Sequence, residues 1–211
     1  MSRLLLLGAS GLVGRTALSL ALADARVSEV VAPSRRALPA HPRLRNPIID
    51  FDAIDPDASD WRVDAVICAL GTTIRDAGSQ AAFRRVDYDY PLAFAKLAQA
   101  AGARAFALTS AKNANPHSRV FYSRTKGELE LALRAIGYDS LTLLRPGLLD
   151  GDRQAHRPME QLALRISRGL DGVLPAAWRA VPASAVAKHL LAAALQATPG
   201  VQVIESAQLL D

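Results

Sequence analysis

Short apolar runs alternate along the chain with longer segments in which apolar residues recur at helical spacing. Strands are predicted over residues 4–7, 27–32, 48–51, 65–70, 105–108, 141–144 and 201–204, and helices over 12–22, 81–101, 121–136, 160–168 and 183–197. Continuous apolar strands that alternate with helices are typical of βαβ units around a parallel sheet. The pattern therefore predicts an α/β fold: a doubly wound parallel sheet with helices on both faces.

The alternation changes after Gly147. Residues 150–158 are charged and contain prolines, and a helix, a Gly/Pro/Trp-containing loop, an alanine-rich helix and a last strand follow. This tail is too short for a domain of its own. We therefore expect one domain over residues 1–211, in which residues 148–211 form a short cap on the substrate side, over the carboxyl ends of the strands.

Composition narrows the class of protein. The chain has 211 residues, of which 50% are hydrophobic and 21% charged, as in compact globular domains. A single cysteine, Cys68, excludes an intramolecular disulfide and a cysteine-rich zinc site, and His156 has no partners at metal-ligand spacing. No apolar stretch has the length of a signal peptide or of the roughly 20 residues that span a bilayer. We expect a cytoplasmic protein without a membrane segment or a metal.

The net charge of +5 is distributed along the chain, with acids between the arginines and no run of five or more basic residues. This distribution does not favour nucleic acid as a partner. We expect a small-molecule substrate and a monomer or homodimer.

A glycine-rich segment, residues 8–14, directly follows the first strand and opens the first helix. Glycines at such a turn let the backbone approach a pyrophosphate, and the helix start stabilises the anion with its free N–H groups. The alternative is a turn without a ligand, but the position inside a βαβ unit favours a dinucleotide site of Rossmann type. The residues expected to bind the cofactor here are Gly8, Ser10, Gly11, Leu12, Val13 and Gly14.

The end of the second strand is where Rossmann proteins bind the adenosine ribose, usually through an acid. Here the sequence reads Ala32-Pro33-Ser34-Arg35-Arg36. An acid would repel a 2′-phosphate, whereas Ser34 and Arg35 are suited to binding one. We therefore expect NADP, with NAD as the alternative, and a solvated surface charge is the alternative for Arg35.

Tyr122 and Lys126 are four residues apart, and therefore lie on one face of the predicted helix over 121–136. A fixed cation beside a phenol favours the phenolate, which suits acid/base work. Ser110 lies twelve residues before Tyr122, at the end of a predicted strand, where its hydroxyl would reach the same edge of the sheet. The alternatives are a chance spacing for the pair and a cap for Ser110.

The glycine spacing, Ser110, Tyr122 and Lys126 resemble the short-chain dehydrogenase/reductase superfamily. The resemblance implies that Tyr122 donates the proton, Ser110 orients the substrate oxygen and Lys126 holds the nicotinamide ribose. Where many relatives carry an asparagine on the preceding helix, this sequence reads Val86-Asp87-Tyr88.

Further segments resemble one atypical branch of the superfamily, which includes the oxidoreductase-like Tat-interacting protein of animals and its bacterial homologues. They are residues 50–51, 70–73, 86–90, 126–128, 145–147, 152–154 and 157–158. The resemblance implies that Asp50 and Phe51 border the adenine, and that Leu70, Gly71 and Thr72 line the cofactor. The animal relatives are described mainly as regulators bound to NADP.

Arg153 and Arg157 are candidates for binding an anionic group of the substrate, with a solvated loop as the alternative. The sequence thus predicts an NADP-dependent oxidoreductase that transfers a hydride between nicotinamide and a small carbonyl or alcohol. One alternative is a dinucleotide-bound regulatory or partner-binding module with little turnover. The other is an NAD-dependent epimerase or dehydratase, ranked lower because such enzymes have a larger C-terminal region.

Overall fold

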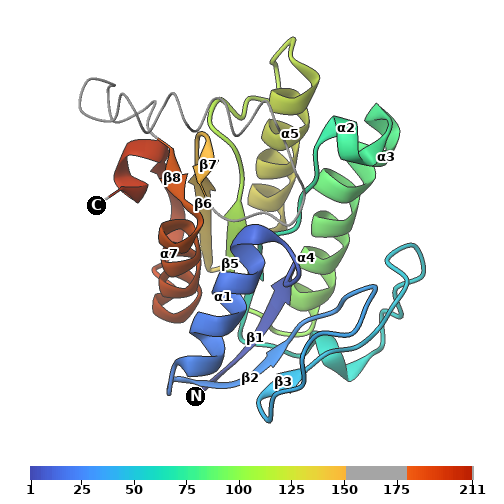
Figure 1. Cartoon of the computed structure of the whole chain (residues 1–211), viewed down its shortest axis with the longest axis vertical. Helices are drawn as coiled ribbons and strands as arrows, with labels where there is room; N and C mark the ends of the chain where they lie inside the picture. Colours follow the sequence, from blue (N-terminus) through green and yellow to red (C-terminus); the bar gives the residue numbers. More distant parts are fainter. Residues whose placement is uncertain (151–179, 211) are drawn as a thin grey trace.

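The central feature of the computed structural model is a parallel sheet of seven strands in the order β3-β2-β1-β4-β5-β6-β9 (Figure 1). The structure describes residues 1–150 and 180–210. The strands are β1 (Ser2–Leu7), β2 (Val27–Val31), β3 (Leu44–Arg45), β4 (Ala65–Cys68), β5 (Ala105–Thr109), β6 (Ser140–Arg145) and β9 (Gly200–Glu205). The strand order reverses between β1 and β4, which makes the sheet doubly wound and creates a crevice at that point.

Helices cover both faces of the sheet (Figure 1). Helices α1 (Leu12–Ala23) and α7 (Ala183–Gln196) pack on one face, and α4 (Tyr90–Ala100) and α5 (Phe121–Ile136) on the other. The shorter elements are η1 (Ser59–Trp61), α2 (Ile74–Ala77), α3 (Gln80–Arg84), η4 (Ser206–Leu209) and a pair of strands, β7 (Leu149–Asp150) and β8 (Val181–Pro182).

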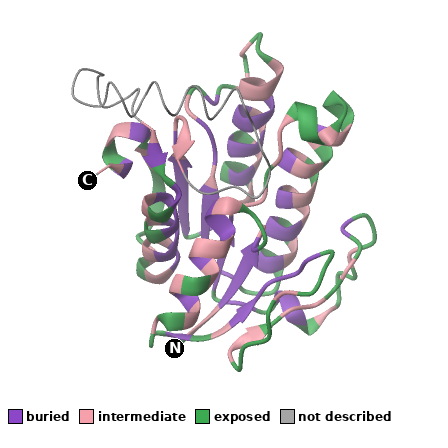
Figure 2. Ribbon diagram, in the orientation of Figure 1, coloured by how far each residue is buried: buried purple, intermediate pink, exposed green. Residues whose placement is uncertain are grey.

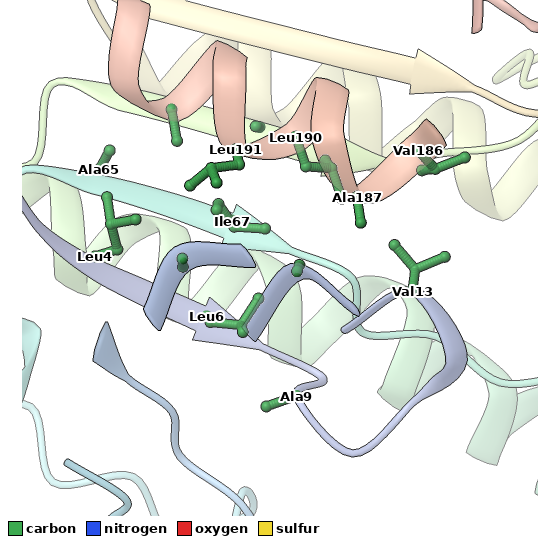
Figure 3. Packing of buried hydrophobic residues seen from close by; sticks show 14 of the residues in the cluster. Leu4, Leu6, Ala9, Val13, Ala65, Ile67, Val186, Ala187, Leu190 and Leu191 are labelled. Carbon is green, nitrogen blue, oxygen red and sulfur yellow. The ribbon is translucent and has the colours of Figure 1, made fainter. Parts of the chain in front are cut away.

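Alternation along β1 divides the core into two layers. Leu4 and Leu6 face the α1 and α7 side, and Leu5 and Leu7 face the α4 side. On the first side Val186, Ala187 and Leu190 of α7 belong to the same buried cluster as Leu4 and Leu6 of β1 and Ile67 of β4 (Figure 3). The inner strands are buried along nearly their whole length (Figure 2), which confirms the continuous apolar runs as central parallel strands.

The predicted third strand, residues 48–51, is wrong. The strand that pairs with β2 is β3, where Leu44 and Arg45 lie beside Val30 and Val31. Residues 48–51 contribute only a bridge between Ile48 and Ser34. The apolar residues Ile48 and Ile49 have the character of a strand. Pro47, however, has no N–H to donate, which interrupts the hydrogen-bond ladder with β2.

The helix predicted over 81–101 is interrupted. Its span contains α3, then a π-helical turn, η2 (Arg85–Asp89), then α4. The cause is Pro91 in the first turn of α4. Proline lacks the N–H for the helical ladder, and its ring crowds the carbonyl four residues earlier, so the backbone widens ahead of it.

The expected cap over residues 148–211 is wrong for its last part. Strand β9 pairs with β6 in the main sheet from Ser140↔Gly200 to Arg145↔Glu205, and α7 covers the sheet beside α1. The helix predicted over 160–168 lies outside the described residues. Within residues 1–150 and 180–210, none of the helices has the length and apolar character needed to span a bilayer.

Candidate functional site

A cavity of about 550 Å³ opens at the carboxyl ends of β1, β4 and β5, where the strand order reverses. Sheets of this type bind their ligands at this crevice. The cavity is lined by Ser10, Gly11, Leu12, Val13, Arg15, Ala69, Leu70, Gly71, Thr72, Thr73, Asp87, Thr109, Ser110, Tyr122, Lys126, Gly147, Leu148 and Leu149.

The glycine-rich segment forms one wall, and two of its glycines are fixed by close backbone approaches. Gly8 has φ +82°, and a Cβ there would lie 2.6 Å from the carbonyl oxygen of Ala69. A Cβ on Gly14 would lie 2.0 Å from the carbonyl oxygen of Gly8. Gly8 and Gly14 therefore shape the turn, while residues 10–13 face the cavity.

The start of α1 faces the same cavity. Gly11 precedes the helix in an extended conformation, and the first turn, residues 12–15, carries no acidic side chain. The positive end of the helix dipole is therefore not offset by a carboxylate of that turn, which favours an anionic group in the cavity.

Helix α5 brings Tyr122 and Lys126 to the opposite wall, as their spacing predicts. Lys126 is only 4% exposed, and its Nζ lies 2.7 Å from Oδ1 of Asp87. Burial alone lowers the pKa of Lys126, but the charge of Asp87 and then the phenol of Tyr122 outweigh burial, so the pKa lies above its ordinary value. Lys126 is therefore a cation in this site.

The ring of Tyr122 rests against Phe83 of α3, with 5.5 Å between the ring centroids. Phe83 is completely buried and also contacts Phe121. This aromatic contact holds the phenol at the edge of the cavity.

Ser110 follows β5 and reaches the cavity, where its hydroxyl donates to Oε1 of Glu130 over 2.5 Å. Glu130 is 3% exposed and accepts two further hydrogen bonds from Arg145, at 3.0 and 2.6 Å. Arg145 also donates to Glu205. The hydrogen bonds to Glu130 raise the pKa of Arg145 above its ordinary value, so Arg145 is a cation at this position.

The residues predicted at the adenosine end lie outside the cavity lining. Ser34 is buried, and its hydroxyl accepts from Asn46 over 2.8 Å and donates to the carbonyl of Arg36 over 2.6 Å. Arg35 is exposed at the end of β2. The Ser34 hydroxyl is therefore engaged within the turn, whereas the guanidinium of Arg35 is on the surface.

The side chains of Phe51 and Asp50 contact neighbouring protein groups and do not line the cavity. The ring of Phe51 packs edge to face against Tyr90 and Phe94, at centroid distances of 5.4 and 5.3 Å. Asp50 accepts a hydrogen bond from the backbone N–H of Asp52. Arg153 and Arg157, the predicted substrate contacts, lie outside the described residues.

The sequence reasoning assigned no role to Asp87 or Glu130. A signal for Glu130 was present, because it lies four residues after Lys126 and eight after Tyr122, on the same helix face. Asp87 stands in the segment where many relatives carry an asparagine, but its contact with Lys126 is visible only in three dimensions. The same holds for the hydroxyl of Thr109, which is buried and has no hydrogen-bond partner among the described residues.

Solved structures share this fold. The UDP-glucuronic acid 4-epimerase of Bacillus cereus in complex with NAD superposes with a TM-score of 0.71 at 15% identity, over 96% of this chain and 78% of the epimerase. A short chain dehydrogenase family protein of Francisella tularensis gives a TM-score of 0.67 at 15% identity, over the whole of both chains. The fold is thus that of the Rossmann proteins of the short-chain dehydrogenase and epimerase class.

Two sets of sequence relatives identify the family. The chain is 38% identical to protein HTATIP2 of Rattus norvegicus over 194 residues, 88% of this chain and 78% of the relative. It is 33% identical to the mitochondrial protein fmp52 of Emericella nidulans over 175 residues, 77% of this chain and 73% of the relative. No protein-family model matches the sequence. The chain belongs to the family of HTATIP2 and FMP52, as the resemblance to an atypical short-chain dehydrogenase implied.

Proposed function

We propose that the protein is an NADP-dependent oxidoreductase that transfers a hydride between nicotinamide and a small carbonyl or alcohol. The observation that carries this proposal is the meeting of Ser110, Tyr122 and Lys126 with the glycine-rich wall in one cavity. A hydroxyl, a phenol and a buried cation at such a crevice suit proton transfer to and from an oxygen.

The cavity fits a nicotinamide dinucleotide in three ways. The glycines at 8 and 14 allow the close backbone contacts that shape the turn, and this turn places residues 10–13 at the cavity. The start of α1 offers its N–H groups to a pyrophosphate. Thr109, which also lines the cavity, has a buried hydroxyl without a hydrogen-bond partner within residues 1–150 and 180–210. Residues 10–13 would hold the phosphates, and Leu70, Gly71 and Thr72 would line the nicotinamide half. When bound, the cofactor supplies the hydride donor or acceptor.

Each catalytic residue has a task that its surroundings support. The Tyr122 hydroxyl gives a proton to the substrate oxygen in reduction and takes it back in oxidation. The Lys126 ammonium, held at the cavity by Asp87, binds the ribose hydroxyls and keeps a positive charge near the phenol. Ser110 orients the oxygen of an alcohol substrate by accepting a hydrogen bond from its hydroxyl, since the proton of Ser110 is donated to Glu130.

The preference for NADP rests on the end of β2. No acid is present over residues 33–36, and Arg35 and Arg36 are exposed there. Arg35 is the residue that would neutralise a 2′-phosphate. Ser34, whose hydroxyl is used inside the turn, shapes the backbone that presents it. Asp50 and Phe51 lie in the segment that follows and would border the adenine.

The epimerase neighbours suggest a second reaction on this fold, but this chain covers only 78% of the Bacillus cereus epimerase. A regulatory module that binds a dinucleotide with little turnover is the other alternative. A pure sensor has no need of a phenol held beside a buried cation, so the Tyr122 and Lys126 pair favours an enzyme. The mitochondrial name belongs to the FMP52 relatives, and a cytoplasmic location for this chain stays a prediction.

The test combines binding and turnover. NADPH and NADH are titrated by their fluorescence, and a panel of aldehydes and ketones is screened with the tighter cofactor. Tyr122→Phe should lower turnover by about 10² or more, with cofactor affinity nearly unchanged. Tyr88→Phe is the matched control, because Tyr88 lies outside the cavity lining. The guanidinium of Arg84 packs on the ring of Tyr88, and this contact is kept when the hydroxyl is removed. A full rate in Tyr122→Phe removes Tyr122 from the mechanism, and a partner that binds only the dinucleotide-loaded chain supports the regulatory alternative.

A further inference from the structure

Asp87 is a buried carboxylate at the reacting end of the cavity. It is 1% exposed and lies at the centre of the π turn η2. Because Pro91 prevents a regular helix at this point, the turn is widened, and single π turns of this kind are frequent at functional sites. The widened turn brings Asp87 into the cavity lining.

The two carboxylate oxygens face different partners, Oδ1 in an ion pair and Oδ2 in a hydrogen bond. Oδ1 lies 2.7 Å from Nζ of Lys126, and Oδ2 accepts the backbone N–H of Thr72 over 2.8 Å. Gly71 packs directly on the pair, since a Cβ there would lie 3.1 Å from Oδ1 of Asp87. Asp87 therefore joins α5 to the loop after β4 and fixes the position of the Lys126 ammonium.

The pair also fixes the local charge. Lys126 and Asp87 are both nearly inaccessible to water, with side-chain exposures of 5% and 1%, so their charges are weakly screened. Together they contribute no net charge. Lys126 alone would make this end of the cavity positive, and Asp87 alone would make it negative.

Oxidised and reduced nicotinamide differ by one charge, since the ring is positive in NADP⁺ and neutral in NADPH. We propose that Asp87 sets the relative affinity for oxidised and reduced dinucleotide by offsetting the charge of Lys126. This inference rests on the proposed function, which places the nicotinamide half beside Lys126. Asp87 acts through Lys126 and the field of the pair, and is a positioning residue.

The proposal fixes the sign of the effect for three variants. Asp87→Asn leaves the cation of Lys126 without its counter-charge, so NADP⁺ should lose affinity relative to NADPH by about tenfold. Lys126→Met leaves the carboxylate alone, so the ratio should shift in the opposite direction. In Asp87→Asn/Lys126→Met the pair is removed together, and the ratio should return to near the wild-type value.

The experiment measures the Kd of NADP⁺ and of NADPH for the full chain and each variant, by calorimetric titration at constant ionic strength. Asp89→Asn is the matched control, because Asp89 lies in the same π turn but is exposed, and its ratio should equal that of the wild type. A purely structural role for Asp87 would weaken both ligands equally. The ratio therefore separates a charge effect from a loss of structure.

Opposite shifts in the two single variants support the proposal. Equal affinity losses for NADP⁺ and NADPH in Asp87→Asn overturn it. If Asp87→Asn does not fold, the Lys126→Met and double variants still decide, because an unchanged ratio in Lys126→Met also overturns the proposal. A wild-type chain that binds neither dinucleotide overturns the proposed function itself.

Discussion

Ser110 donates its hydroxyl proton to Glu130, a buried carboxylate that accepts two hydrogen bonds from Arg145 at the same time. The direction of the serine hydrogen bond follows from this arrangement, because a carboxylate engaged by a guanidinium has no proton to donate. Ser110 therefore offers lone pairs to the cavity, and the group that it orients best is a hydroxyl.

Removing the charge of Glu130 should destabilise the fold. In Glu130→Gln the Arg145 guanidinium loses its buried partner, and breaking such pairs costs about 3–5 kcal/mol; since Arg145 keeps Glu205, we expect the lower end of that range or less. The free energy of unfolding in urea measures the loss. Glu128→Gln is the control, because Glu128 is on the same helix but pairs with Arg84 near the surface. An equal loss of unfolding free energy in the two variants would contradict a stabilising role for the buried Glu130–Arg145 ion pair.

Reversing the charge of Arg35 should reverse the cofactor preference. Charge-assisted hydrogen bonds contribute about 1.5–3 kcal/mol, so the wild type should prefer NADP(H) to NAD(H) by roughly tenfold to a hundredfold. Arg35→Asp should abolish or invert this ratio with little change in stability, because Arg35 is exposed. Calorimetric titration of both dinucleotides provides the measurement. Arg62→Asp is the control, an exposed arginine before the amino end of β4. An Arg35→Asp ratio equal to that of the control would show that Arg35 points to solvent.

A side chain at Gly14 should disrupt the glycine-rich turn. The Cβ of alanine would overlap the carbonyl oxygen of Gly8 at 2.0 Å, so the backbone must move. Gly14→Ala should lower the melting temperature and weaken dinucleotide binding by roughly tenfold or more, since each ~1.4 kcal/mol of lost contacts lowers affinity tenfold. Gly11→Ala, whose Cβ would lie 3.3 Å from the same oxygen, should have a smaller effect on both. A stable, tightly binding Gly14→Ala would contradict the close approach.

The buried thiol of Cys68 should make stability fall at alkaline pH. Burial raises the pKa of Cys68 from about 9 to about 11. The unfolded chain therefore releases the thiol proton at lower pH than the folded chain does, and stability falls as the pH rises from about 9 to 11, by about 2 kcal/mol from this group. Urea unfolding of wild type and Cys68→Ala at pH 8 and 10.5 provides the measurement. The difference between the two proteins should shrink at the higher pH, and a constant difference would contradict the assignment.

Most of the sheet was predictable from the sequence, because buried parallel strands are continuous apolar runs whose ends are marked by Gly and Pro. The position of Ser110 at the crevice was predictable for the same reason, since the carboxyl ends of neighbouring strands share one edge, and the shared face of Tyr122 and Lys126 followed from their helical spacing. The strand β3 was not predictable, because its two residues, Leu44 and Arg45, carry no apolar run.

The partners of the site residues could not be predicted. The contacts of Lys126 with Asp87 and of Ser110 with Glu130 join residues 39 and 20 positions apart, through packing that no local pattern records. The inward hydrogen bonds of Ser34 depend on Asn46 in the same way. Local sequence predicts which residue types gather at the crevice, and tertiary packing decides which atoms remain free to meet a ligand.

The packing of α1 against α7 has a consequence for how the chain is made. The face of α1 that carries Ala17 and Ala21 is buried by Ala187 and Leu190, near the other end of the sequence. During synthesis the part of this face that meets α7 stays uncovered after α1, β1 and β2 have been made, until α7 has been translated as well. Contacts of such long sequence separation form slowly and leave apolar surface open to aggregation. The α1 side of the core should therefore be completed only when α7 is released.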